Sequence, residues 1–165
     1  ETAGNTAMTV DESGATARPL QPAFLAVPAA AQDNMASSAY VTTVLGTEVF
    51  DTGGDFTGNT FTAPVAGKYF LCANLTVAAI DHDATFYTQV AIQTSNKYNS
   101  ENWSVQNFLD AEPDSFTYQL SGTFQLDASD TAYMTYRTTG PGAAQEDVYD
   151  SGNVEFTNFG GILMV

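Results

Sequence analysis

The residue best suited to catalysis in this sequence is its single histidine, His82, in the run Asp81-His82-Asp83. A neighbouring carboxylate can orient an imidazole as a general base, and the same residue types can ligate a metal ion. Both roles need further groups from other segments, but the sequence has no second histidine and only one cysteine. It also lacks the nucleophile elbow of serine hydrolases. We therefore interpret His82 as part of a solvated loop, and we predict a protein that is not an enzyme and carries no cofactor.

Calcium is the ion that the acidic loops favour, because it requires several hard oxygen ligands. The sequence has no contiguous calcium-binding loop of the EF-hand type, so the ligands would have to converge from separate loops or subunits. The competing interpretation, which we prefer, is that these loops are negatively charged and solvated. The candidate calcium ligands are Asp81, Asp83, Asp147 and Asp150.

Three aromatic residues are the candidates for ligand binding. Tyr98 and Trp103 lie in a polar stretch, residues 97–103, and Phe108 follows shortly after it. Aromatic rings beside asparagine and carboxylate groups are typical of surfaces that bind sugars or proteins. The alternative is that Trp103 fills a sheet edge or a seam between subunits.

The charge of the chain disfavours two classes of partner. The 165 residues include 19 acidic and 4 basic side chains, which gives a net charge of -15. Such a surface repels phosphate backbones and anionic lipids, so we expect neither nucleic acid nor a membrane as a partner. A saline medium would screen the self-repulsion. The single cysteine, Cys72, leaves no partner for an internal disulfide and is expected to be a small buried residue.

The length predicts one domain, preceded by a short arm. Residues 1–21 are rich in Thr, Ala, Gly and Ser and offer little apolar surface to bury. We predict that they form a flexible arm, or a strap that becomes ordered on a partner. From residue 22 to residue 165, aromatic and β-branched residues alternate with turn residues. No window has a convincing helical stripe, and a brief helical turn is expected at residues 29–36.

Alternation of apolar and polar residues predicts an all-β protein. The clearest case runs from Phe116 to Leu126, and a second runs from Tyr69 to Val77. Half-buried antiparallel strands with short turn-rich connections are typical of a β-sandwich or jelly roll. Strands are predicted at residues 23–27, 39–45, 69–77, 86–92, 116–126, 132–138 and 154–164, and loops at 51–59, 80–84, 95–101, 110–115, 127–131 and 140–153.

Several ordered segments resemble the globular head of complement component 1q, whose jelly roll is shared with the tumour necrosis factor superfamily. Pro22-Ala23-Phe24 is similar to the opening strand of that family, and residues 61–70 (FTAPVAGKYF) are similar to its most characteristic segment. Residues 121–126 (SGTFQL) and 158–163 (NFGGIL) are similar to its later strands. Two features depart from the family. Ser129 replaces the glycine of a Gly-Asp turn, and residues 1–21 lack the period of a collagen stalk.

The resemblance implies a ten-stranded antiparallel jelly roll that assembles as a homotrimer around an apolar axis. It carries no catalytic residues over to this chain. The apolar C-terminal segment suits either a central strand or a subunit interface, and the alternative is an ordinary core strand in a monomer. The candidate trimer-interface residues are Phe24, Phe156, Phe159, Ile162 and Met164.

Two functions compete at this point. The first is a non-enzymatic virion surface protein: a capsid decoration or cement protein of a tailed virus, or a fibre-head module. Its partners would be capsid shell proteins, and the N-terminal arm would attach it to the shell. The second is a secreted or tail-fibre recognition module, which would bind glycans or proteins of a host surface through its loops. The protein is accordingly expected on the virion surface or, in the second case, outside the cell.

Overall fold

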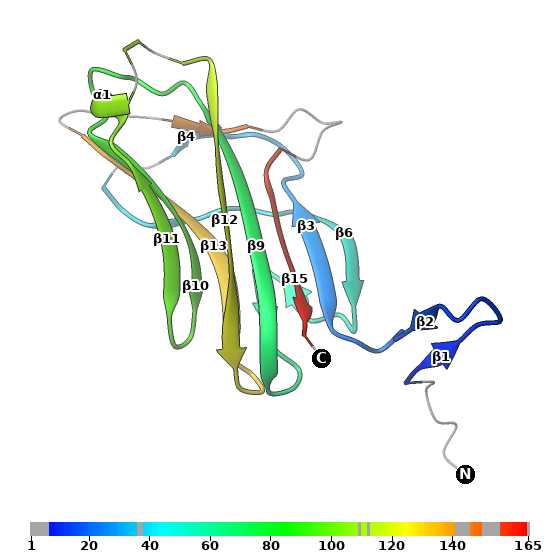
Figure 1. Cartoon of the computed structure of the whole chain (residues 1–165). Coiled ribbons are helices and arrows are strands. Elements are labelled where there is room, and N and C mark those ends of the chain that lie inside the picture. The colour runs from blue at the N-terminus through cyan, green and yellow to red at the C-terminus, as the bar shows by residue number, and fades with distance from the viewer. Residues whose placement is uncertain are drawn as a thin grey trace.

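Alternating apolar residues build the two longest strands of the protein, whose computed structural model is shown in Figure 1. In β9 (Gly67–Ala78), every second side chain from Tyr69 to Val77 is fully buried. β12 (Ser115–Leu126) pairs with β9 antiparallel along its whole length. It buries Tyr118 and Leu126 and exposes the polar residues between its apolar positions. The two alternating patterns therefore form one wall of the core, as predicted.

The structure describes residues 7–35, 38–108, 110–111, 113–140, 146–149 and 156–164. Within these ranges, the single helical element is the short turn α1 (Val105–Phe108). None of the helical structure in them is long and apolar enough to cross a membrane. The prediction of an all-β chain is confirmed.

The strands form two packed sheets (Figure 1). Sheet I has the order β4-β14-β9-β15-β3-β6, with β12 on the other edge of β9. Sheet II has the order β11-β10-β13-β8-β7, with β5 also paired to β13. The remaining bounds in sheet I are β3 Ala23–Val27, β4 Gln32–Met35, β6 Thr47–Thr52, β14 Glu146–Val148 and β15 Asn158–Leu163. Those in sheet II are β5 Val41–Thr42, β7 Phe56–Thr57, β8 Thr60–Thr62, β10 Tyr87–Thr94, β11 Tyr98–Trp103 and β13 Thr131–Thr139.

The core between the sheets contains a cluster of phenylalanine rings. Phe24 of β3 stacks on Phe61 of β8 at 4.6 Å and on Phe56 of β7 at 5.2 Å between ring centroids. Phe159 of β15 meets the ring of Phe24 edge-on at 5.1 Å. Aromatic pairs at these spacings contribute beyond the area that they bury. This cluster therefore links the N-terminal strand, the C-terminal strand and sheet II.

A small hairpin stands apart from the sandwich at the N-terminal end (Figure 1). Its strands are β1 (Thr9–Val10) and β2 (Thr16–Ala17), and residues 7–20 are all exposed. The turn is organised by Asp11, whose Oδ1 accepts hydrogen bonds from Ser13 N at 2.8 Å and Ala15 N at 2.9 Å. The arm predicted for residues 1–21 thus contains a hairpin, which forms its hydrogen bonds locally rather than against the sandwich.

Four predicted connections contain strands instead, and one of them is the loop 51–59, which holds the end of β6 and all of β7. The helical turn expected at residues 29–36 is wrong, because Gln32–Met35 is β4 and Met35 lies opposite Glu146 of β14. β14 itself falls in the predicted loop 140–153, and β11 overlaps the predicted loop 95–101. These short or polar segments are strands because a neighbouring backbone pairs with them. The predicted strand 39–45 is reduced to β5, Val41–Thr42. The predicted number of ten strands is not confirmed, because short strands such as β7 add to the long ones.

Candidate functional site

Sheet I exposes a band of apolar side chains on the face that points away from the core. Ile162 of β15 lies opposite Phe70 of β9, and Phe50 of β6 lies opposite Leu25 of β3. Paired residues of neighbouring strands present their side chains on the same face, so the band crosses four adjacent strands. Phe50, Phe70, Ile162 and Met164 are 49%, 40%, 44% and 46% exposed. We call Leu25, Phe50, Phe70, Ile162 and Met164 the sheet I patch.

The chemistry of the sheet I patch is that of a protein interface. Contiguous apolar surface of this kind is uncommon on monomers and is typical of interaction sites. Ile162 and Met164, two of the predicted trimer-interface residues, belong to it. A third, Phe156, is 43% exposed and packs its ring against that of Tyr149 at 5.9 Å. These three side chains are available to a second chain.

The other two predicted interface residues require a correction. Phe24 and Phe159 are 1% and 0% exposed, because their rings fill the phenylalanine cluster inside the protomer. They have no surface left for a neighbouring chain. The sequence interpretation also missed Phe50 and Phe70. The exposure of Phe70 was predictable, because it directly follows the buried Tyr69 in an alternating strand and so lies on the opposite face of the sheet.

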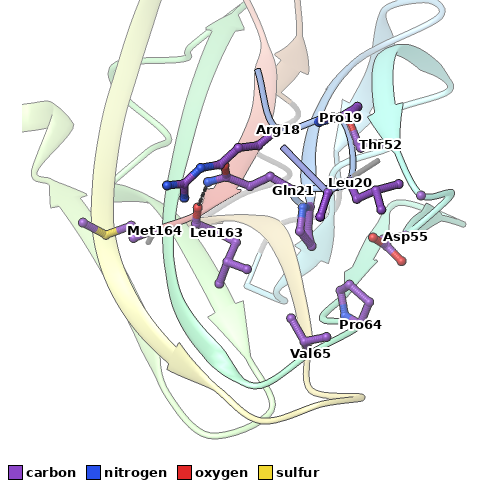
Figure 2. A pocket seen from close by; sticks show the side chains of 13 residues that line it. Arg18, Pro19, Leu20, Gln21, Thr52, Asp55, Pro64, Val65, Leu163 and Met164 are labelled. Atoms are coloured by element: carbon purple, nitrogen blue, oxygen red, sulfur yellow. Dashed lines mark hydrogen bonds between the residues drawn. The ribbon is translucent and has the colours of Figure 1, made fainter. Parts of the chain in front are cut away.

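A cavity of about 560 Å³ lies beside this patch, between the root of the arm and the end of the sandwich (Figure 2). The arm is attached here to the C-terminal strand: Leu163 N donates to Pro22 O at 2.9 Å, and Gln21 Nε2 donates to Leu163 O. Arg18 and Asp55 bring opposite charges to the lining. Burial, with the nearby charge of Asp51, raises the pKa of Asp55. The cavity is otherwise mainly apolar, and its walls are Ala7, Pro19, Leu20, Gln21, Pro22, Thr52, Gly53, Pro64, Val65, Leu163 and Met164.

The three predicted calcium ligands that the structure describes, Asp81, Asp83 and Asp147, do not form a metal-binding group. Asp81 Oδ1 accepts hydrogen bonds from Asp83 N and Ala84 N, both at 3.0 Å, and so organises its own turn. Asp147 Oδ1 accepts from Asn34 N at 2.8 Å, and Asp150 lies outside the described residues. Among the residues that the structure describes, no group of three or more His, Cys, Asp or Glu side chains could hold a metal ion. Calcium binding stays a prediction from the sequence.

Two of the three aromatic candidates, Tyr98 and Trp103, lie on a strand rather than on a loop. Tyr98 opens β11 opposite Gln93 and is 69% exposed. Trp103 ends the same strand opposite Thr88, and Phe108 ends α1. The side chains of Trp103 and Phe108 lie outside the described part of the structure. Tyr98 and Trp103 therefore occupy opposite ends of β11, and only Tyr98 is placed as an exposed ring.

Two ionisable side chains with raised pKa values, Cys72 and Glu146, lie outside the sheet I patch and the cavity. Cys72 is half-buried on the outer face of sheet I rather than fully buried, and desolvation raises the pKa of its thiol. Glu146 is 0% exposed, and its Oε1 accepts hydrogen bonds from Thr85 Oγ1 and Thr138 Oγ1, both at 3.1 Å. Burial raises the pKa of Glu146 to about 7, and the hydrogen bond from Thr85 offsets part of this effect.

Comparison with solved structures identifies the fold. The globular domain of zebrafish complement 1qA has a TM-score of 0.57 and 12% sequence identity, over 87% of this chain and 98% of that one. Murine APRIL, solved at pH 5.0, has a TM-score of 0.57 and 14% identity, over 87% of this chain and 99% of that one. No family model matches the sequence, and no curated protein matches it. At such identities the likeness shows the fold alone. The chain has the jelly roll shared by the complement 1q globular domain and TNF-like APRIL, as its sequence motifs indicated.

Proposed function

We propose that this protein is a non-enzymatic binding module that assembles as a homotrimer through the sheet I patch. The observation that carries the proposal is the apolar band itself, with four side chains that are 40–49% exposed on one face. Burying such a face between copies removes apolar area from water, which is the main driving force of association. We propose three copies, rather than another number, because the sequence resemblance implies a homotrimer.

A measurement of mass in solution tests the assembly. Light scattering should give three times the chain mass of 17.5 kDa. Ile162→Asp places a carboxylate in the centre of the patch and should shift the mass to that of the monomer, because a buried unpaired charge opposes association. Phe86→Asp is the matched control: Phe86 is 50% exposed, just before β10 of sheet II, and its replacement should leave the mass unchanged. A monomeric wild-type protein, or an unaltered mass for Ile162→Asp, would contradict the proposal.

Within this class, we propose that the trimer decorates the surface of a virion and that the arm attaches it to shell proteins. The hairpin of β1 and β2 supports this role, because it is ordered by its own hydrogen bonds yet exposes Met8 at 55% and Val10 at 61%. Exposed apolar side chains on a projecting hairpin are suited to a groove on a partner. The alternative, a secreted or tail-fibre recognition module, is favoured by the exposed ring of Tyr98.

Truncation separates the arm from the fold. Deleting residues 1–17 removes the hairpin but keeps Gln21 and Pro22, which bond to the C-terminal strand. The thermal midpoint and the mass in solution should not change, since residues 7–17 are exposed. Binding to purified particles or shell proteins, measured by co-sedimentation, should be lost. If the truncated protein co-sediments as well as the full chain, the arm is not the attachment, and the trimer proposal is unaffected.

A further inference from the structure

The outer face of sheet II carries a cluster of polar and aromatic side chains around one arginine. Arg137 of β13 lies opposite Gln89 of β10, and Gln89 lies in turn opposite Asn102 of β11. On the other side of β13, Val41 of β5 pairs with Tyr136, which places Tyr40 beside Arg137. We call Tyr40, Tyr87, Gln89, Asn102 and Arg137 the Arg137 cluster.

Two tyrosine rings hold the guanidinium group. Arg137 Cζ lies 5.1 Å from the centroid of the Tyr40 ring and 5.9 Å from that of the Tyr87 ring. Both distances are within the range of cation–π attraction. Tyr40 is itself fixed, because its hydroxyl donates to Gln89 Oε1 at 2.8 Å. The two rings fix the orientation of the planar guanidinium group, but they do not form hydrogen bonds with the N–H groups at its edge.

This cation lacks an acceptor within the described part of the chain. Arg137 Nε is buried without a hydrogen-bond partner, and no hydrogen bond or ion pair reaches the side chain from any described residue. A guanidinium carries five N–H donors, and buried donors in proteins are almost always paired. The neighbouring Gln93 shows the contrast. Its Nε2 donates to Thr135 Oγ1 at 3.0 Å, and its Oε1 accepts from Tyr133 Oη at 3.3 Å.

The outward positions around Arg137 on β10, β11 and β13 carry no acidic residue, although the chain has 19 of them against 4 basic ones. The strand register sets which side chains point outward from β10, β11 and β13, the three longest strands of sheet II. These positions are Tyr87, Gln89, Ala91 and Gln93 of β10, Tyr133, Thr135, Arg137 and Thr139 of β13, and Tyr98, Ser100 and Asn102 of β11. No carboxylate among these positions neutralises Arg137, so its charge is available to an anion.

We propose that the Arg137 cluster binds a glycan through a carboxylate-bearing sugar. The flat fork of a guanidinium matches the two oxygens of a carboxylate, which it can bind through two parallel hydrogen bonds. The exposed amide of Asn102 suits the hydroxyl groups of a sugar, and the ring of Tyr40, 48% exposed and held by the buried Gln89, suits its C–H face. The net charge of -15 disfavours a strongly acidic peptide, whereas one carboxylate on an otherwise neutral glycan meets less repulsion. This site does not depend on the trimer or on the arm.

Binding of defined sugars to the full chain tests the proposal. The acidic probes are sialyllactose and methyl galacturonide, which carry one carboxylate each, and lactose is the neutral probe. At least one acidic probe should bind in titration calorimetry, and lactose should not. In a nitrogen-edited NMR spectrum, the same probe should shift the Arg137 Nε–H resonance. If neither acidic probe binds more tightly than lactose, the proposal is overturned.

Variants assign the binding to the guanidinium. Arg137→Gln should weaken it about tenfold or more, and Arg137→Lys should also weaken it, because lysine keeps the charge but loses the planar fork. Lys97→Gln, in the exposed turn between β10 and β11, removes the same charge and should change the affinity less than about twofold. A thermal melt of each variant checks that it is folded. Unchanged binding in Arg137→Gln would overturn the assignment, as would an aspartate peptide that binds in an Arg137-dependent way when neither acidic sugar does.

Discussion

Replacing Phe24 with alanine should lower the free energy of unfolding by about 4 kcal/mol, the middle of the range for replacing a buried phenylalanine with alanine. The ring is 1% exposed and contacts Phe56, Phe61 and Phe159 at centroid distances of 5.2, 4.6 and 5.1 Å. Because these neighbours come from three other strands in two sheets, they cannot all move inward to close the cavity. The loss should therefore include a cavity contribution as well as the lost burial of the ring.

Chemical denaturation at a fixed protein concentration measures this loss. Concentration must be held constant because association of the folded chain would add to its apparent stability. Phe86→Ala removes the same ring from a position that is 50% exposed and should cost less than about 1 kcal/mol. Similar losses for the two variants would mean that Phe24 does not occupy a close-packed core.

The core was largely predictable from local sequence because the large apolar residues of its longest strands alternate with other residues. The buried apolar residues of β9 and β12 lie at alternate positions, so no long-range information is needed to place them on one face. Residues 61–70 and 158–163 indicated the jelly roll through their resemblance to segments of the complement 1q globular head. The comparison with solved structures confirms that part of the prediction.

The polar and short strands could not be predicted from local pattern. β11, with the sequence YNSENW, has no apolar alternation, and it forms because six of its residues pair with β10. β4 and β14 are paired with each other although they are more than 100 positions apart, as the hydrogen bond from Asn34 N to Asp147 shows. A strand that is stabilised mainly by its partner carries little signal in its own sequence.

The candidate sites were only partly predictable, because strand pairing brings together residues that are distant in the sequence. Ile162 and Met164 stood out because they lie in an unusually apolar segment, whereas Phe50 and Phe70 join them only through the register of β6, β3, β15 and β9. The Arg137 cluster combines residues near positions 40, 87 and 137, which only the pairing of β5, β10 and β13 brings together. Because aromatic residues are frequent in this chain, none of these phenylalanines and tyrosines indicates a site by its place in the sequence alone.

The buried carboxyl group of Glu146 predicts a strong dependence of stability on pH. Glu146 is 0% exposed, its Oε2 has no hydrogen-bond partner, and two threonine hydroxyls donate to its Oε1. Burial raises its pKa from 4.5 to about 7 in the folded protein. The nearby phenol of Tyr118 responds in the same sense: its burial, together with the negative charges of Glu146 and Glu101, raises its pKa.

Between pH 4.5 and about 7, the folded protein holds a proton on Glu146 that the unfolded chain has released. The unfolded state therefore binds fewer protons, so the free energy of unfolding falls as the pH rises through this window. Below this window, Glu146 is protonated in both the folded and the unfolded state. Above it, Glu146 is ionised in both states, and the full cost of burying the charged carboxylate lowers the free energy of unfolding. A shift of this size corresponds to about 3 kcal/mol. Glu146→Gln removes the ionisation, so it should abolish this dependence and exceed wild type in stability at pH 8.

Denaturation curves at pH 5, 6, 7 and 8 for wild type and Glu146→Gln measure the difference. Glu48→Gln is the matched control, since it removes the same charge from an exposed position on β6 and should retain the slope of wild type. It also corrects for the repulsion among the 19 acidic residues, which changes with pH in every variant. Parallel curves for wild type and Glu146→Gln would show that Glu146 does not titrate in this window. If added calcium stabilises wild type at pH 8 but not Glu146→Gln, the carboxylate is held by a cation instead of a proton.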